Sequence, residues 1–179
     1  MDSHVVPECY IDTMLMKVLV PPKKRWNHQH GCHNVSRELE KGKLKDQFAI
    51  GIIDNDKKQI EYLSHFAEID KFIDENEIGV VLFKHLHHYF IQICPAIEAL
   101  IIQVCKDEGI NLKDYTIPDQ IDELKKITKS QNSEHDERFI RLFQKFKQTQ
   151  NQKLIKLKSW IEFLKEKNYH VDINELKNV

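Results

Sequence analysis

Two aspartates follow a short apolar segment of the chain. Residues 49–53 read Ala-Ile-Gly-Ile-Ile, and Asp54, Asn55 and Asp56 come directly after them. A short apolar run that ends in turn-forming residues indicates a buried strand, and side-chain alternation places Asp54 and Asp56 on the same side of it. Two neighbouring carboxylates repel each other unless a cation lies between them, and Mg²⁺ and Mn²⁺ prefer oxygen ligands. The pair therefore predicts a metal site, with an ordinary β-turn as the alternative.

A third carboxylate, that of Glu8, ends an earlier extended segment. Pro7 cannot donate to a sheet hydrogen bond, so it marks the end or the edge of a strand at residues 4–7. Ligands of open α/β sheets bind at the carboxyl ends of the strands. If the strands that end at Glu8 and Asp54 are parallel neighbours, these carboxylates and that of Asp56 meet at one edge.

The elements that must position these carboxylates follow an α/β order. Apolar runs predict strands at residues 4–7, 48–53, 78–83 and 89–93. Apolar residues at helical spacing predict helices at residues 10–19, 34–45, 57–73 and 95–107. This order predicts a small, mostly parallel sheet flanked by helices.

The character of the chain changes after Pro118. The segments that follow are strongly charged, and their apolar spacing predicts helices at residues 119–129, 134–149 and 151–168. We therefore divide the chain into an α/β domain at residues 1–118 and a C-terminal helical, basic appendage at residues 119–179 that packs on it.

The composition limits the class of protein. The net charge is −1 over 179 residues, so any attraction to nucleic acid must come from local patches. The four cysteines are scattered without a CxxC pair, as expected for reduced thiols. No apolar run has the length of a signal peptide or a membrane span. These features predict a cytoplasmic protein without a membrane partner.

The order of the acidic residues resembles the Toprim (topoisomerase–primase) family. Residues 8–12 (Glu-Cys-Tyr-Ile-Asp) and 52–56 (Ile-Ile-Asp-Asn-Asp) are similar to its pattern of a strand-end glutamate, a helix and a later strand-end Asp-x-Asp. Residues 93–100, with Pro95 and Glu98, resemble the Pro-x-apolar-Glu segment of RloB-like Toprim proteins and of relatives near the OLD-type nucleases. The resemblance covers residues 4–108. The chain departs from the family at Cys9, where many Toprim domains have glycine, and in a long, histidine-rich insertion at residues 22–34.

This resemblance implies phosphoryl chemistry on nucleic acid. Asp54 and Asp56 would hold Mg²⁺ or Mn²⁺, with Glu8 as the catalytic group or a further ligand. Glu98 is another candidate ligand, although it and Asp12 also suit the first turn of a helix as ordinary surface acids. The implied function is a Mg²⁺-dependent nuclease or related phosphotransfer protein in DNA defence or repair. The alternative is a non-catalytic Toprim-like scaffold that binds a protein partner through its helical tail. Because no G-x-x-x-x-G-K-[ST] motif is present, an ATPase partner would be a separate chain.

Two basic segments are candidate nucleic-acid contacts. One is the polar loop after Pro22, and the other is the helical tail, where residues 141–167 hold eight basic side chains against two acidic ones. Such a helix face can follow a phosphate backbone, and the alternative is a solvated face. The predicted contacts are Lys23, Lys24, Arg25, Lys153, Lys156 and Lys158.

Two groups of histidines complete the inventory. Residues 28–33 contain three histidines and Cys32, which are zinc-ligand types. Ligands bunched in six residues cannot all bind one ion, so a loop that contacts phosphates and a solvated loop are the alternatives. The histidines of residues 85–88 are interpreted as polar turn residues, and Lys84 beside them is a weaker phosphate candidate.

Overall fold

A five-stranded sheet lies at the centre of the computed structural model, which describes residues 2–55, 60–130 and 135–179. The strand order is β1-β2-β5-β4-β3. β1, β2 and β5 run parallel, while β4 and β3 continue the sheet antiparallel to their neighbours. The strands are β1 (Val5–Pro7), β2 (Ala49–Asp54), β3 (Ala67–Ile73), β4 (Gly79–His85) and β5 (His88–Cys94). The predicted α/β class is confirmed, and the parallel half of the sheet contains both predicted site strands.

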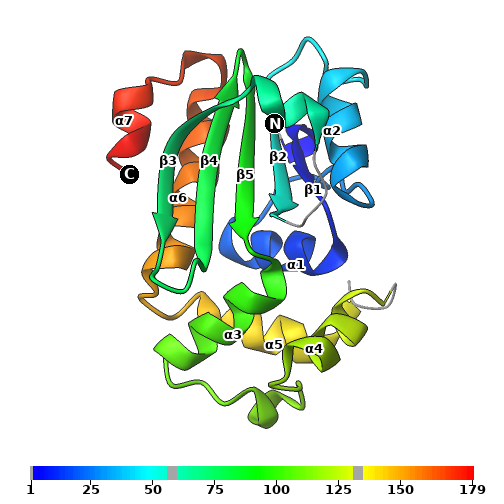
Figure 1. Ribbon diagram of the computed structural model, residues 1–179, viewed down its shortest axis with the longest axis vertical. Helices are drawn as coiled ribbons and strands as arrows, with labels where there is room; N and C mark the ends of the chain where they lie inside the picture. The colour runs from blue at the N-terminus through cyan, green and yellow to red at the C-terminus, as the bar shows by residue number, and fades with distance from the viewer. Residues whose placement is uncertain (1, 56–59, 131–134) are drawn as a thin grey trace.

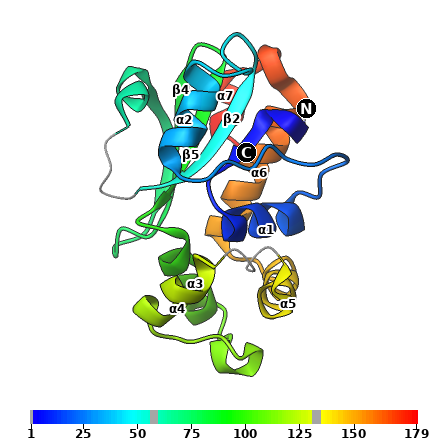
Figure 2. The same cartoon turned by 90° about the vertical axis from the view of Figure 1, so that its right-hand side faces the viewer.

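Helices cover both faces of the sheet and its carboxyl edge. The sheet lies between α2 on one side and α6 on the other (Figure 2). α3, α4 and α5 lie beyond the ends of β2 and β5 (Figure 1). The helices are α1 (Tyr10–Leu19), α2 (Cys32–Glu40), α3 (Ile97–Asp107), α4 (Ile121–Thr128), α5 (Glu137–Phe146), α6 (Gln152–Lys167) and α7 (Ile173–Lys177).

Side-chain alternation along the strands builds two cores. Ile50 and Ile52 of β2 face the larger core, while Ala49 and Ile53 face the smaller one under α2. Gly51 lies on the same face as Ala49 and Ile53, where any side chain would collide with the ring of Phe90. The larger core also holds the apolar stripe of the predicted tail, namely Leu142, Phe146, Leu154, Leu157, Ile161 and Leu164. The helices after Pro118 therefore share one core with the sheet.

The prediction of a helix at residues 57–73 was wrong for the part of this segment that the structure describes. Residues 61–65 form a short 3₁₀ helix and residues 67–73 form the edge strand β3. A hairpin turn joins β3 to β4, in which Asp74 Oδ1 accepts hydrogen bonds from the N–H groups of Asn76 and Ile78. Pairing with β4 satisfies the backbone of β3, and the charged residues of an exposed edge strand obscure its period of two.

The other predicted elements are present with small boundary shifts. The second helix begins at Cys32 and ends at Glu40, and α3 begins at Ile97, two residues after Pro95. Within the described residues, no helix combines the length and the apolar character needed to cross a membrane.

Candidate functional site

Glu8 and Asp54 lie at adjacent strand ends, as the sequence predicted. β1 and β2 are parallel with Pro7 opposite Ile52, so the residues that follow both strands emerge at the same edge. Glu8 Oε2 accepts a hydrogen bond of 3.0 Å from the backbone N–H of Asp54. Asp54 Oδ1 in turn accepts one of 2.9 Å from the backbone N–H of Ile97, at the start of α3. Three chain segments therefore converge on these two carboxylates.

Asp12 is a further carboxyl group at this edge, and it is completely buried. Its Oδ2 accepts a hydrogen bond of 3.1 Å from the backbone N–H of Cys9, and Cys9 Sγ accepts one of 3.3 Å from the N–H of Asp12. This reciprocal pair is a capping box at the start of α1. Asp12 Oδ1 is buried and has no hydrogen-bond partner among the described residues. Helix capping accounts for Oδ2 of Asp12. A buried Oδ1 without a donor is energetically costly unless a proton or a cation binds to it.

Glu98 brings the C-terminal part of the chain to the site. It is buried in the first turn of α3. Its Oε1 accepts a hydrogen bond from the hydroxyl group of Thr128, the last residue of α4. The sequence predicted Glu98 through the family resemblance, but it contained no sign that Thr128 would hold it.

Burial and repulsion between neighbouring acids raise the pKa values of two of these carboxyl groups, Asp54 and Asp12. Burial, followed by repulsion from Asp12 and Glu8, raises the pKa of Asp54 to about 10. Burial is also the main reason why the pKa of Asp12 rises to about 7, although its hydrogen bond with Cys9 opposes the rise. Strongly shifted acids in a cleft are typical of functional sites. Burial raises the pKa of the Cys9 thiol as well, so this thiol caps a helix as a neutral group and is a poor nucleophile.

Glu8, Asp54 and Glu98 line a pocket of about 470 Å³ whose walls also carry cations, and Asp12 is buried behind it. Lys125 and Lys129 reach it from α4, four residues apart on one helical face. Tyr10 and His30 line the wall nearest to α1. Sequence reasoning missed both lysines, because nothing in their segment indicates that α4 lies across the carboxyl edge of the sheet. Their spacing of four was the one available signal.

The donor set of this pocket suits a hard divalent cation. Mg²⁺ is commonly bound through one or two carboxylates, with water and substrate phosphate as its other ligands. Glu8 and Asp54 supply such a pair. Across residues 2–55, 60–130 and 135–179, no three His, Cys, Asp or Glu side chains form a group that holds one ion together. The predicted ligand Asp56 lies outside the described residues.

Two of the three predicted basic contacts on α6 form ion pairs with aspartates outside this helix. Lys153 is buried, and its Nζ lies 3.0 Å from Asp74 Oδ2 and 3.2 Å from Asp107 Oδ2. Lys156 Nζ lies 2.9 Å from Asp70 Oδ2. Lys158 is the most exposed of the three. Two of these lysines therefore fasten α6 to neighbouring elements.

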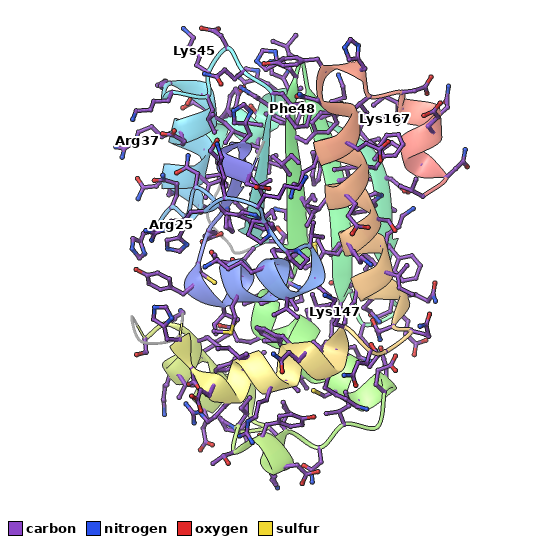
Figure 3. The ribbon with its side chains drawn as sticks, turned by 180° about the vertical axis from the view of Figure 1, so that it is seen from behind. Arg25, Arg37, Lys45, Phe48, Lys147 and Lys167 are labelled. Carbon is purple, nitrogen blue, oxygen red and sulfur yellow. The ribbon has the colours of Figure 1, made fainter. Side chains whose placement is uncertain are left out.

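The basic loop after Pro22 lies apart from the acidic pocket. The backbone N–H groups of Lys23 and Lys24 both donate to Asp2 Oδ2 at 2.8 Å, and their side chains are exposed. Seen from behind the sheet, Arg25 lies to the side of α6 (Figure 3). The structure does not bring this group together with Lys153 and Lys156, and none of these residues lines the acidic pocket.

The second histidine group is structural. His88 is buried, donates from Nε2 to the carbonyl of Leu44 (3.0 Å), and has the hydroxyl of Tyr62 2.6 Å from its Nδ1. Lys84 donates to the carbonyl of Leu86 within its own turn. These contacts agree with the interpretation of residues 85–88 as a turn.

Comparison with protein-family models, with curated proteins and with solved structures found no match for this chain. Its function must therefore be argued from the chemistry of the pocket.

Proposed function

We propose that this protein is a Mg²⁺- or Mn²⁺-dependent nuclease, or a related phosphotransfer enzyme, that acts on nucleic acid with a Toprim-like arrangement of acids. The observation that carries the proposal is the acidic pocket itself. Glu8, Asp54 and Asp12 each accept a backbone N–H through one oxygen, and a purely structural arrangement would satisfy the remaining buried oxygens as well. Asp12 instead retains a buried oxygen without a partner among the described residues, and neighbouring acids help to raise the pKa values of Asp12 and Asp54.

The pocket also contains the groups that a phosphodiester needs. Glu8 and Asp54 would hold the cation, which when bound supplies positive charge to a phosphate. Lys125 and Lys129, on the α4 wall, would contact the phosphate oxygens. Glu8 is the residue that we assign to accept or donate a proton, since it directly follows β1 and lines the pocket. Thr128 positions Glu98 beside them.

The rival function, a scaffold that binds a partner through its tail, has less support. The apolar side chains of α5 and α6 are buried in the core, so a partner would meet the outward, polar side of these helices. No exposed apolar stripe on either helix favours such a partner within the described residues.

Cleavage assays test the enzyme directly. Wild-type protein is incubated with single- and double-stranded DNA and RNA in Mg²⁺ and in Mn²⁺. We expect cleavage of at least one substrate, and we expect Glu8→Gln to reduce its rate by roughly 10²-fold or more. Glu123→Gln, on the exposed side of α4, is the matched control and should cleave as wild type does. The proposal fails if wild type cleaves none of the four substrates, or if Glu8→Gln cleaves as fast as wild type.

A further inference from the structure

Three aromatic rings are packed together beside the acidic pocket. The ring of Tyr10 stacks on that of His28, with centroids 4.3 Å apart and planes 14° from parallel. The ring of His30 stands almost perpendicular to both, at 5.1 Å from Tyr10 and 4.8 Å from His28. Thr13 Oγ1 lies 3.0 Å from His28 Nδ1, and the Tyr10 hydroxyl lies 3.3 Å from His30 Nε2. The rings of Tyr10 and His28 therefore support each other, and Thr13 contacts His28, while His30 is exposed.

The backbone of the same loop fixes this cluster relative to Glu8. The loop runs along the outer edge of β1, where the N–H groups of Asn27 and Gln29 donate to the carbonyls of Val5 and Pro7, both at 3.1 Å. The N–H of Gly31 then donates to the carbonyl of Glu8 at 3.3 Å. An extended segment bonded along a strand edge holds its register. The rings are consequently attached to the strand that ends at the pocket.

The pocket thus has two chemically different walls. Tyr10 and His30 contribute aromatic rings, with that of His30 exposed and nearly perpendicular to that of Tyr10, and Lys125 and Lys129 contribute cations beside the carboxylates. Proteins that bind single-stranded nucleic acid combine these two features, since bases stack on aromatic faces while cations follow the backbone. Bases within a duplex are already stacked on their neighbours and cannot reach such a wall without being unstacked.

Building on the proposed function, we infer that the Tyr10–His28–His30 cluster is a stacking platform for an unpaired nucleobase, so that the substrate class is single-stranded nucleic acid. The base stacks on the ring of His30, and the contacts of this ring with Tyr10 and His28 fix its orientation. A zinc site in this loop is disfavoured by the same contacts, because His30 Nε2 faces the Tyr10 hydroxyl and His28 Nδ1 faces Thr13.

Binding experiments test the inference separately from cleavage. All variants are made in an Asp54→Asn background, which removes a proposed cation ligand so that turnover does not obscure binding. The probes are a fluorescently labelled oligothymidylate and a blunt duplex, followed by fluorescence anisotropy in Mg²⁺. We expect the oligothymidylate to bind at least tenfold more tightly than the duplex. His30→Ala should weaken its binding by roughly fivefold to a hundredfold, the scale of one lost base stack.

Two matched variants and one modified probe identify stacking as the cause. His30→Tyr keeps an aromatic face and should keep the affinity. His33→Ala removes an exposed histidine of the same loop that does not line the pocket, and it should bind as the background does. An oligomer with abasic sugars in place of its bases should lose the affinity and become insensitive to His30→Ala.

Each outcome decides the inference. Equal binding of duplex and single strand, equal effects of His30→Ala and His33→Ala, or no binding of the oligothymidylate would overturn it. If wild type cleaves nucleic acid but shows no dependence on the ring of residue 30, the platform is wrong and the enzyme stands. If base-dependent binding is found without any cleavage by wild type, the platform stands and the protein is a binding module.

Discussion

The carboxylate of Glu8 accepts a hydrogen bond from the backbone N–H of Asp54 at 3.0 Å. This bond joins the ends of β1 and β2 just beyond their last paired residues. The distance between the two acids is therefore set by strand pairing, which is more rigid than a loop. Several consequences of that arrangement can be measured.

Removal of the Asp54 charge should abolish stabilisation by metal. Asp54→Asn keeps an oxygen that accepts from the N–H of Ile97, so the fold should survive. A ligand present at a hundred times its Kd stabilises the folded state by about 2.7 kcal/mol, which for a chain of this size raises Tm by roughly 5–10 °C. Thermal unfolding with Mn²⁺ and with EDTA measures the shift. The exposed Asp114→Asn is the control, and a shift of equal size in Asp54→Asn would remove this residue from the site.

Metal-free protein should lose stability as the pH rises. The pKa values of Asp12 and Asp54 in the folded state lie above the ordinary value of 3.8, at about 7 and about 10. Between 3.8 and these values the unfolded chain has released protons that the folded chain retains, so the free energy of unfolding falls with pH. It is greatest below 3.8, as far as these two groups are concerned.

The Asp54→Asn variant should show a shallower decline, because its side chain has no proton to release. Near pH 8 without metal it should exceed wild type in stability by on the order of 1 kcal/mol. Urea unfolding in EDTA at several pH values between about 5 and about 8 gives both curves. Parallel curves for wild type and variant would show that Asp54 is not strained in the folded protein.

The buried ion pairs of Lys153 should matter for stability. Lys153→Met keeps most of the packing but leaves Asp74 and Asp107 without their shared cation, and should cost about 1–2 kcal/mol. Lys158→Met removes an exposed lysine 3.9 Å from Glu162 and should change stability by less than about 0.5 kcal/mol. Urea unfolding separates the two. If Lys153→Met instead leaves stability unchanged and weakens DNA binding, the predicted role of this residue in nucleic-acid contact is correct.

The hydroxyl of Thr128 should influence metal affinity through Glu98. Thr128→Val has nearly the same shape but deprives the buried carboxylate of its donor. Partners of this kind typically contribute tenfold or more to metal affinity, so the Mn²⁺ concentration at half-maximal thermal shift should rise roughly tenfold. Thr128→Ser retains the hydroxyl and should behave as wild type. Identical midpoints for the Val and Ser variants would leave Thr128 with a packing role alone.

The strands of the parallel half were predictable because each is a short apolar run with a clear end. Glu8 and Asp54 could be placed together from sequence for the same reason, since parallel neighbours expose the residues after them at one edge. β3 was not predictable in this way: its four apolar residues are exposed or half-buried and do not alternate regularly, and its strand character depends on pairing with β4. The turn at Asp74, followed by Glu75, Asn76 and Glu77, was the signal that a hairpin followed.

The second half of the site was beyond sequence reasoning for a different reason. Lys125 and Thr128 belong to a short amphipathic helix, with Lys129 as its C-cap, and the pattern of this helix shows only which side is buried. Its position over the carboxyl edge of the sheet depends on the path of the chain through α3 and the 3₁₀ turn at Leu112–Tyr115. Long-range placement of this kind is decided by packing and leaves no local motif.

The cover that α6 provides for the sheet has a consequence for the order of synthesis. All five strands leave the ribosome before residues 152–167, so the nascent chain carries the apolar side chains of Ile50, Val80 and Leu82 without the helix that packs over their core. Incomplete chains with bare sheet surface are prone to misassembly. Because α4 and α6 belong to the same core as the sheet, a chain arrested early would lack the finished pocket. The residues that line the pocket end at Lys129, while residues 152–167 complete the core on which they rest.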